Sequence, residues 1–277
     1  MQKAKANQLK DKLKQADIKL HGARLNFMAR FIMAMITVRT VSLPRIASVL
    51  NGAVEIASNE KRIKRFFSEV KIEGEWLAKC VLSWLPQGPY LLTLDRTNWK
   101  LGSININILM LGVANKGMAF PLLWTVLSHA GNSNTAERLA LIDKLLEILG
   151  HEDIEALVAD REFTGKDWFK GLKEKRISFV MRLRNNTLVG YKGRNKRASQ
   201  RYKDVKEGEM FVPSKRCRVL GTHLYIAVTR SPSGELVVVA TTSKAKKALG
   251  RYAKRWGIET LFGALKSRGF NLEDTHI

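Results

Sequence analysis

Cysteine is scarce in this sequence, and its two cysteines form no recognisable pattern. Cys80 and Cys217 lie far apart in the chain, and neither belongs to a CxxC pair. Disulfide frameworks and structural zinc sites both need several closely spaced cysteines, so the sequence excludes them as the basis of this fold. Such a chain suits a reducing compartment, and we expect it in the cytoplasm.

Long apolar segments are also lacking. The opening residues, MQKAKANQLKDKLKQ, are polar and contain no apolar core of a signal peptide. The most apolar early stretch, from Phe27 to Val38, is interrupted by Arg30 and is too short to cross a bilayer. No internal repeat is visible. We therefore expect a protein that makes no contact with a membrane.

Acidic residues are few relative to basic ones. The 277 residues include 48 Lys and Arg but only 25 Asp and Glu, which gives a formal net charge of +23. Such an excess attracts polyanions, of which nucleic acid is the commonest, although a ribosomal or merely basic protein would share it. The hydrophobic content of 45% is enough for a globular core. The length allows a catalytic domain with one or two small appendages.

Residues 1–85 are predicted to contain helices only. Apolar residues recur there at helical spacing, as in Leu9, Leu13, Ala16 and Leu20. Two short helices are expected at LPRIASVLN and SNEKRIKRFF, with Pro44 in the first turn of one and Ser58 or Asn59 capping the other. The second helix carries Arg62 and Arg65 on a basic face. Either a helix-turn-helix-like DNA-binding region or a solvated helix of an ordinary bundle would have this pattern.

From Tyr90 onward, short apolar segments alternate with amphipathic ones. YLLTLD is predicted as a buried strand that ends in an acid, SININILMLGVAN and GMAFPLLWTVLS as a hairpin, IEALVAD as a fourth strand and ISFVMRL as a fifth. TAERLALIDKLLEILG, with Thr135 as cap and Gly150 as terminator, and GKDWFKGLKEK are predicted helices. The order over residues 86–183 is therefore β-β-β-α-β-α-β. This is the order of a ribonuclease-H-like α/β core with a mixed sheet.

Two further regions complete the predicted organisation. Residues 184–243 are basic and rich in strand-like segments, with a long hairpin around the turn from Ser231 to Gly234. We expect them to form a β-rich insertion. Residues 244–277, which contain KAKKALGRYAKRWGIETLFGALKSRGF, are predicted to return to the core as one long helix.

Three acids suggest the chemistry. Asp95 and Asp160 each stand at the end of a predicted strand, and Glu259 lies on the final helix. If the first and fourth strands are neighbours, both aspartates emerge at the same edge of the sheet, which is the edge where ligand sites on such sheets usually lie. Clustered carboxylates bind hard divalent cations such as Mg²⁺. Two such ions, about 4 Å apart, could promote in-line displacement at a phosphodiester.

These segments resemble the DDE transposases of bacterial insertion sequences, in particular the IS-four family. The resemblance is carried by LTLDRTNWKLGSININILMLGVANKG, LVADREFTGKDWF and RYAKRWGIETLFGALKSRGF, over roughly residues 86–277. Its signature Tyr-x2-Arg-x3-Glu-x6-Lys is matched by Tyr252, Arg255, Glu259 and Lys266. The resemblance implies that Asp95, Asp160 and Glu259 hold Mg²⁺, which Mn²⁺ can replace, and that Tyr252, Arg255 and Lys266 hold the DNA strand.

The resemblance also implies a β-rich insertion between the second Asp and the Glu. In this family a Trp can stabilise a flipped base, but the insertion here contains none. Tyr191, Tyr202 or Tyr225 could stack on an extruded base instead, although a packing role suits each of them.

The resulting hypothesis is a two-metal-ion DNA transposase, associated with the nucleoid. It would bind double-stranded DNA, both the terminal inverted repeats and the target, and act as a homodimer during synapsis. Because the chain stops at NLEDTHI, soon after the signature helix, we expect a C-terminal truncation. Two other hypotheses stay open: a non-catalytic DNA-binding remnant that inhibits a full-length transposase, and a stand-alone nuclease of the same fold.

Overall fold

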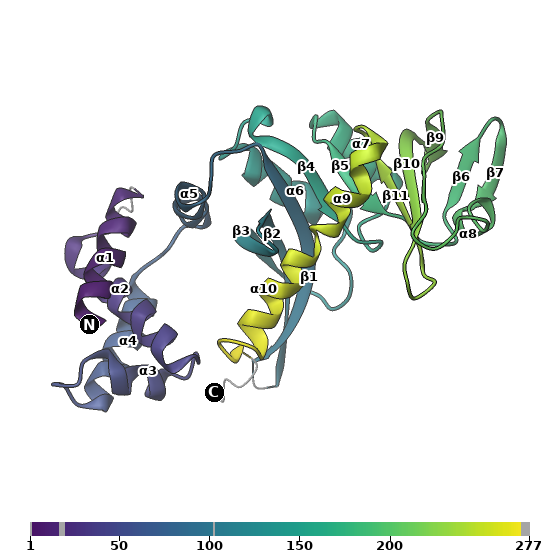
Figure 1. Ribbon diagram of the computed structural model, residues 1–277. Helices are drawn as coiled ribbons and strands as arrows, with labels where there is room; N and C mark the ends of the chain where they lie inside the picture. The colour runs from purple at the N-terminus through teal and green to yellow at the C-terminus, as the bar shows by residue number, and fades with distance from the viewer. Residues whose placement is uncertain (1, 17–19, 102, 273–277) are drawn as a thin grey trace. The chain divides into compact units, whose positions relative to one another are not determined.

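A computed structural model describes residues 2–16, 20–101 and 103–272 (Figure 1). The chain divides into two compact units. The helical unit comprises Met1–Pro86, Thr97–Ile108 and Leu261–Ile277, and the sheet unit comprises Gln87–Arg96 and Leu109–Thr260. The chain end at 273–277, on which the expectation of a truncation rests, lies outside the described residues.

The N-terminal region is all-helical, as predicted. Its helices are α1 (Gln2–Gln15), α2 (Gly22–Val38), α3 (Leu43–Leu50), α4 (Ile56–Glu69) and α5 (Gly74–Trp84). Their apolar faces meet in two clusters, one around Leu25, Met28 and Phe66 and the other around Ile46 and Ile63. Removal of these faces from water is what holds such short helices together.

The connection between α3 and α4 differs in detail from the prediction. Pro44 lies in the first turn of α3, as expected. The expected cap is wrong, because α4 begins at Ile56 with Glu55 before it, so Ser58 and Asn59 lie inside the helix. Asn59 is fully buried, and its amide donates hydrogen bonds to the carbonyls of Ala47 at 3.0 Å and of Asn51 at 3.1 Å. This side chain therefore ties α4 to the end of α3 from within.

Among the described helices, no single one is both long enough and apolar enough to span a membrane. Only α2 and α3 taken together meet both criteria, and those two helices are bent by 113° relative to each other.

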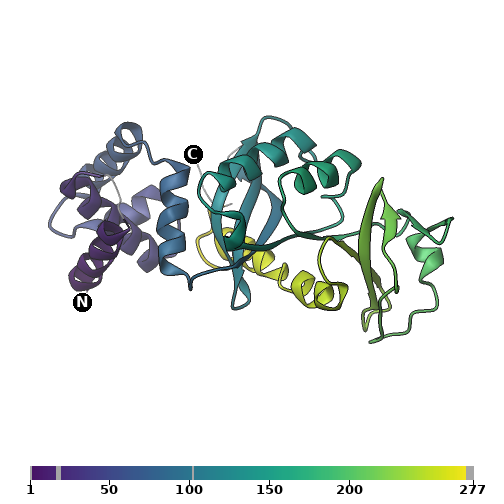
Figure 2. The same ribbon diagram turned by 90° about the horizontal axis from the view of Figure 1, so that it is seen from above.

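The α/β core follows the predicted order. It consists of β1 (Tyr90–Leu101), β2 (Ile104–Asn115), β3 (Met118–Leu127), α6 (Thr135–Leu146), β4 (Ile154–Ala159), α7 (Lys166–Glu174) and β5 (Phe179–Arg182). The strands lie in the order β3-β2-β1-β4-β5, and β4 is parallel to both β1 and β5. This is a ribonuclease-H-like mixed sheet. Figure 2 shows α6 and α7 on one of its faces and the later helix α9 (Ala248–Ala253) on the other.

Local signals explain most of these boundaries. The β2–β3 hairpin turns through Lys116 and Gly117, both with positive φ, the geometry of a two-residue turn that matches strand twist. Helix α6 is capped by Asn134 in a capping box with Glu137, one residue before the Thr135 that we expected. It ends at Leu146, before the predicted terminator at Gly150.

The β-rich insertion is confirmed, and it extends the core sheet. Its elements are β6 (Leu188–Tyr191), β7 (Arg194–Arg197), α8 (Ala198–Arg201), β8 (Met210–Phe211), β9 (Cys217–Val219), β10 (Thr222–Arg230) and β11 (Leu236–Thr241). Strands β10 and β11 form the predicted long hairpin, which closes where Arg230 pairs with Leu236. Because β11 pairs antiparallel with β5, the insertion adds its strands to the edge of the core.

The predicted single C-terminal helix is broken. After the short turn at Ala245–Lys247, α9 and α10 (Trp256–Lys266) are separated at Lys254 and Arg255, whose N–H groups bond to carbonyls three residues earlier. Such tight turns interrupt an α-helix and rotate the next helix relative to the one before it. At the start of α10, a β carbon on Gly257 would lie 2.8 Å from the backbone of Met118, so a glycine is needed for this close approach to β3.

Candidate active site

Two aspartates lie side by side at the carboxyl ends of β4 and of the part of β1 that pairs with it. The parallel register runs through Leu94 and Ala159, and the next residues are Asp95 and Asp160. Contrary to the prediction, β1 does not end at its acid but continues to Leu101. Only the pairing of β1 with β4 ends at Asp95. Beyond it, side chains from other elements can approach the edge of the sheet.

Arg255 links two of the three predicted acids. Its guanidinium donates to Asp95 Oδ2 at 3.2 Å through Nη1 and to Glu259 Oε1 at 2.7 Å through Nη2. The Arg255 side chain is only 5% exposed, so its charge depends on these partners. The break before α10 puts Arg255 in this position, one turn from Glu259.

Tyr252 connects the same segment to the second aspartate. Its hydroxyl donates a hydrogen bond to Asp160 Oδ1 at 2.9 Å, and the ring is buried against β4 and β5 in a cluster that includes Val158 and Val180. The segment from Tyr252 to Glu259 therefore contacts both aspartates, one through the tyrosine and the other through Arg255. Helix α9 crosses the sheet beside these strands in Figure 1.

The two aspartates have opposite pKa shifts. Burial raises the pKa of Asp95 to about 6, despite the backbone N–H of Arg96 and the nearby Arg255, and the charges of Glu162 and Asp160 raise it further. Burial also opposes ionisation of Asp160, but the backbone of Arg161, the Tyr252 hydroxyl and nearby arginines outweigh it and lower that pKa. The site thus contains one acid whose pKa is lowered and one whose pKa is raised to about 6, so ionised Asp95 is the carboxylate that a nearby cation would stabilise more.

The donor chemistry suits a divalent cation, but the side chains are not gathered around one point. Among the residues that the structure describes, no three His, Cys, Asp or Glu side chains lie close enough to hold a metal ion together. The guanidinium of Arg255 stands between Asp95 and Glu259, where it balances their charge. Carboxylate oxygens are the ligands that Mg²⁺ prefers, and burial of Asp95 leaves it in need of positive charge. The residue types therefore fit the ion.

Arg182 was missed by reasoning from sequence. Met181 pairs with Ala159, so Arg182 extends the row of Asp95 and Asp160 onto the third parallel strand. Arg182 forms an ion pair with Glu235 and lowers the pKa of Asp160 through its charge. Its place in ISFVMRL gives no hint until the order of the strands is known.

Glu162 is a second missed residue. Its Oε1 lies 3.6 Å from Nε of Arg96, and both side chains are largely buried. Glu162 also raises the pKa of Asp95 through its charge. Arg96 therefore offsets the negative charge of Glu162 beside the site. The side chain of Arg161, in contrast, is exposed. The sequence DREF contains the signal, but an acid two residues after Asp160 is also common in ordinary loops.

The remaining predicted DNA contacts lie in the helical unit. Lys266 donates to the carbonyl of Asn98 at 2.6 Å. Arg62 and Arg65 are exposed on α4, as the basic face predicted, and both line a pocket with Arg24. The guanidinium of Arg62 lies 5.6 Å from the ring centre of Phe27.

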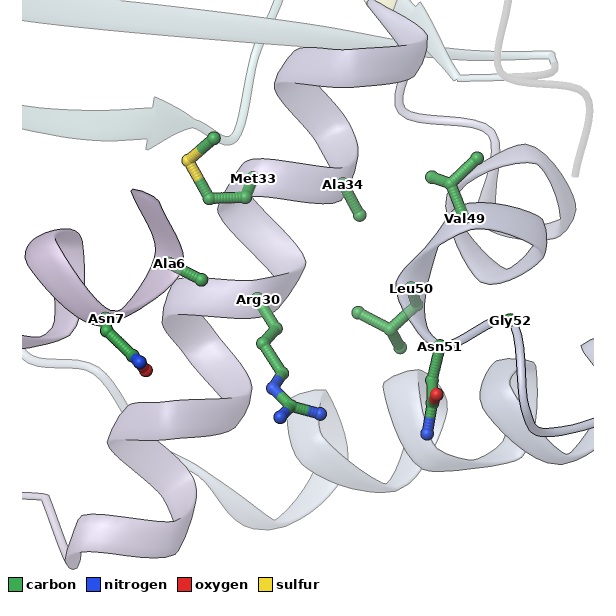
Figure 3. Close-up of a pocket in the computed structure, with 9 residues that line it drawn as sticks. All are labelled: Ala6, Asn7, Arg30, Met33, Ala34, Val49, Leu50, Asn51 and Gly52. Carbon is green, nitrogen blue, oxygen red and sulfur yellow. The ribbon is translucent and has the colours of Figure 1, made fainter. Parts of the chain in front are cut away.

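A separate pocket lies among α1, α2 and α3 (Figure 3). Arg30 of α2 lines it together with Asn7 of α1 and Asn51 at the end of α3, above an apolar floor that includes Ala34 and Leu50. No acid is among the described residues that line it.

The three tyrosines of the insertion have different surroundings. Tyr202 is 4% exposed, and its ring packs 5.9 Å from that of Phe211, so it serves the core of the insertion. Tyr191 and Tyr225 are half-buried, and Arg216 lies 4.7 Å over the ring of Tyr225.

The family is established by residues 92–277, which match the family model described as Transposase DDE domain. The match spans more than half of the chain, so the chain belongs to the transposase DDE domain family. Among solved structures, it is similar to the piggyBac transposase in a cryo-EM synaptic complex with hairpin DNA, at 11% identity and a TM-score of 0.47. The likeness covers 93% of this chain and 64% of the length of that one. No curated protein matches the chain.

Proposed function

We propose that this chain is the cut-and-paste transposase of an insertion sequence. The observation that carries the proposal is the row of Asp95 and Asp160 on adjacent parallel strands, with Glu259 linked to Asp95 through Arg255. Three acids of this kind would supply the carboxylate ligands that two-metal phosphodiester chemistry needs. Membership of the DDE domain family supports the same reaction class.

The proposed cofactor is Mg²⁺, with Mn²⁺ as a substitute. Asp95, Asp160 and Glu259 are the residues that would hold it. When bound, the ion supplies an activated oxygen nucleophile and stabilises the charge of the leaving oxygen. The chain's own part is to hold the acids in place: Tyr252 orients Asp160 by its hydrogen bond, and Arg255 keeps Asp95 and Glu259 paired.

The proposed substrate is double-stranded DNA. In the full reaction, the element ends are nicked, and each freed 3′-hydroxyl attacks the opposite strand to form a hairpin, which is reopened and joined to the target. Tyr252, Arg255 and Lys266 would contact the strand at the cut, and Arg62 and Arg65 of the helical region (1–85) would contact the terminal repeats. The net charge of +23 supports binding to a polyanion. Synapsis of two ends would require a homodimer.

One observation favours a second candidate, a DNA-binding inhibitor that does not cut. With Arg255 between Asp95 and Glu259, the described residues contain no ready-made metal site of three ligands. Such a protein would bind DNA with the salt sensitivity of phosphate contacts, and it would not cleave with any metal.

The experiment compares cleavage and binding in matched variants. Asp95→Asn, Asp160→Asn and Glu259→Gln are tested beside Asp143→Asn and Glu147→Gln, which change one exposed acid on α6 and one just after its end. The substrate is a duplex that carries the DNA flanking the gene, with Mg²⁺, Mn²⁺ or EDTA. We expect metal-dependent nicking by the wild type and both controls, and its loss in the three site variants while binding persists. Equal cleavage by all six proteins would refute the proposed site, and binding without cleavage by the wild type would favour the inhibitor.

A further inference from the structure

A groove with both polar and apolar lining residues lies next to the acid cluster within the sheet unit. It has a volume of about 610 Å³, and its polar lining includes Thr164, Gly165, Arg184, Asn186, Asn195 and Arg218. We call it the insertion groove, because one wall is the loop that leads into α7 and the other consists of strands of the β-rich insertion.

The loop that carries Asp160 also forms a wall of this groove. The N–H of Phe163 bonds to the carbonyl of Asp160 at 2.9 Å, and the Thr164 hydroxyl bonds to the carbonyl of Arg161 at 3.0 Å. Arg184 also reaches that loop, with Nε 3.4 Å from the carbonyl of Arg161. The groove therefore starts within a few residues of the proposed cutting site.

The charge of the groove is of one sign. Arg184 follows β5 and Arg218 lies in β9, so two separate elements contribute a guanidinium, and both side chains are exposed. No Asp or Glu is among the described residues that line the groove. Gly190 lies beneath one wall, where a β carbon would sit 2.6 Å from Oδ1 of Asn195 and 3.3 Å from Arg218. With glycine at this position, the side chains of Asn195 and Arg218 can keep their observed positions.

We propose that the insertion groove binds the sugar-phosphate backbone of the DNA strand as it leaves the acid cluster. This inference rests on the proposed function and adds a contact surface to it. Each guanidinium offers a forked pair of donors that matches two phosphate oxygens, and the amides of Asn186 and Asn195 can donate to phosphate or sugar oxygens. The absence of acids among the described lining residues removes the repulsion that a phosphodiester would otherwise meet.

The test measures how DNA affinity depends on salt. The double variant Arg184→Gln/Arg218→Gln is compared with the wild type by fluorescence anisotropy, on a labelled duplex of arbitrary sequence. Each lost phosphate contact lowers the slope of log affinity against log salt by about 0.9, so two contacts should lower it by about 1.8. Arg176→Gln is the matched control, because it removes an arginine that is also exposed but lies between α7 and the start of β5, outside the groove lining.

The outcomes separate this groove from the proposed enzyme. We expect a reduced slope in the double variant, an unchanged slope in Arg176→Gln, and unchanged thermal unfolding in both. A wild-type slope in the double variant, or an equally reduced slope in the control, would overturn the proposed role of the groove even if the wild type cuts DNA. A reduced slope in the double variant, together with a wild type that does not cut DNA, would support DNA binding by the groove and contradict the proposed cleavage activity.

Discussion

The strongest consequence of the site geometry is a pH-dependent instability at Asp95. Its side chain is 17% exposed, and burial raises its pKa from 3.8 to about 6. An acid with a raised folded-state pKa favours folding most when it is protonated. The contribution of Asp95 is therefore fully present below pH 3.8 and is lost as the pH rises through about 6. At neutral pH, the folded protein holds an ionised carboxylate that water would solvate better.

The size of the effect can be worked out from the shift. A difference of about two pH units corresponds to about 3 kcal/mol of unfolding free energy. Asparagine resembles the protonated acid in shape and cannot ionise. We therefore expect Asp95→Asn to match the wild type near pH 4 and to become more stable than it by about 3 kcal/mol above pH 7.

The assay is urea unfolding at a series of pH values, in EDTA, followed by circular dichroism. Asp143→Asn is the control, because it removes an exposed acid on α6 that is paired with Lys175. A stability difference between Asp95→Asn and the wild type that stays constant from pH 4 to pH 8 would rule out a raised pKa at Asp95. A gain of the same size in Asp143→Asn would show that the effect is not specific to the buried acid.

Three further predictions concern other parts of the molecule. Tyr252→Phe removes the hydroxyl that lowers the pKa of Asp160, so that pKa should rise. The measurement is a carboxyl NMR titration of Asp160 in EDTA, and an unchanged titration would show that the hydroxyl has no such effect. Asn59→Leu leaves buried carbonyls of the α3–α4 connection without a donor, so it should destabilise the helical unit by about 1–3 kcal/mol. Hydrogen exchange should become faster in α3 and α4 but not in β4. Arg62→Gln/Arg65→Gln should weaken duplex binding and lower the slope of log affinity against log salt, while cleavage at saturating DNA is retained. Wild-type affinity at all salt concentrations would count against DNA contacts by α4.

The order of the elements could be predicted because its signals are local. Alternating and continuous apolar segments identify strands, the Asn115-Lys116-Gly117 sequence identifies the first hairpin, and Pro44 marks the start of α3. These signals depend on a few neighbouring residues, and the elements that they predict are present in the structure. The position of Asp95 and Asp160 at one edge could also be predicted, once the first and fourth strands are taken as neighbours.

Other features depend on contacts between distant segments and could not be predicted. The segment RYAKRWGIE favours a continuous helix, yet the chain turns at Lys254 and Arg255, where the buried guanidinium meets Asp95 from β1. In the same way, Asn59 is suited to cap a helix, but its amide is used inside α4 to hold carbonyls of a neighbouring helix and turn. Arg182 acquires its place beside the aspartates only through the pairing of β5 with β4.

The proposed function requires Asp95, Asp160 and Glu259 to form one site for divalent cations. Electron paramagnetic resonance of Mn²⁺, titrated into the protein without DNA, measures the bound ion directly and does not depend on cleavage. We expect binding by the wild type, by Asp143→Asn and by Glu147→Gln, and a marked loss of affinity in Asp95→Asn and Asp160→Asn. Wild-type Mn²⁺ affinity in both aspartate variants would contradict the proposed site.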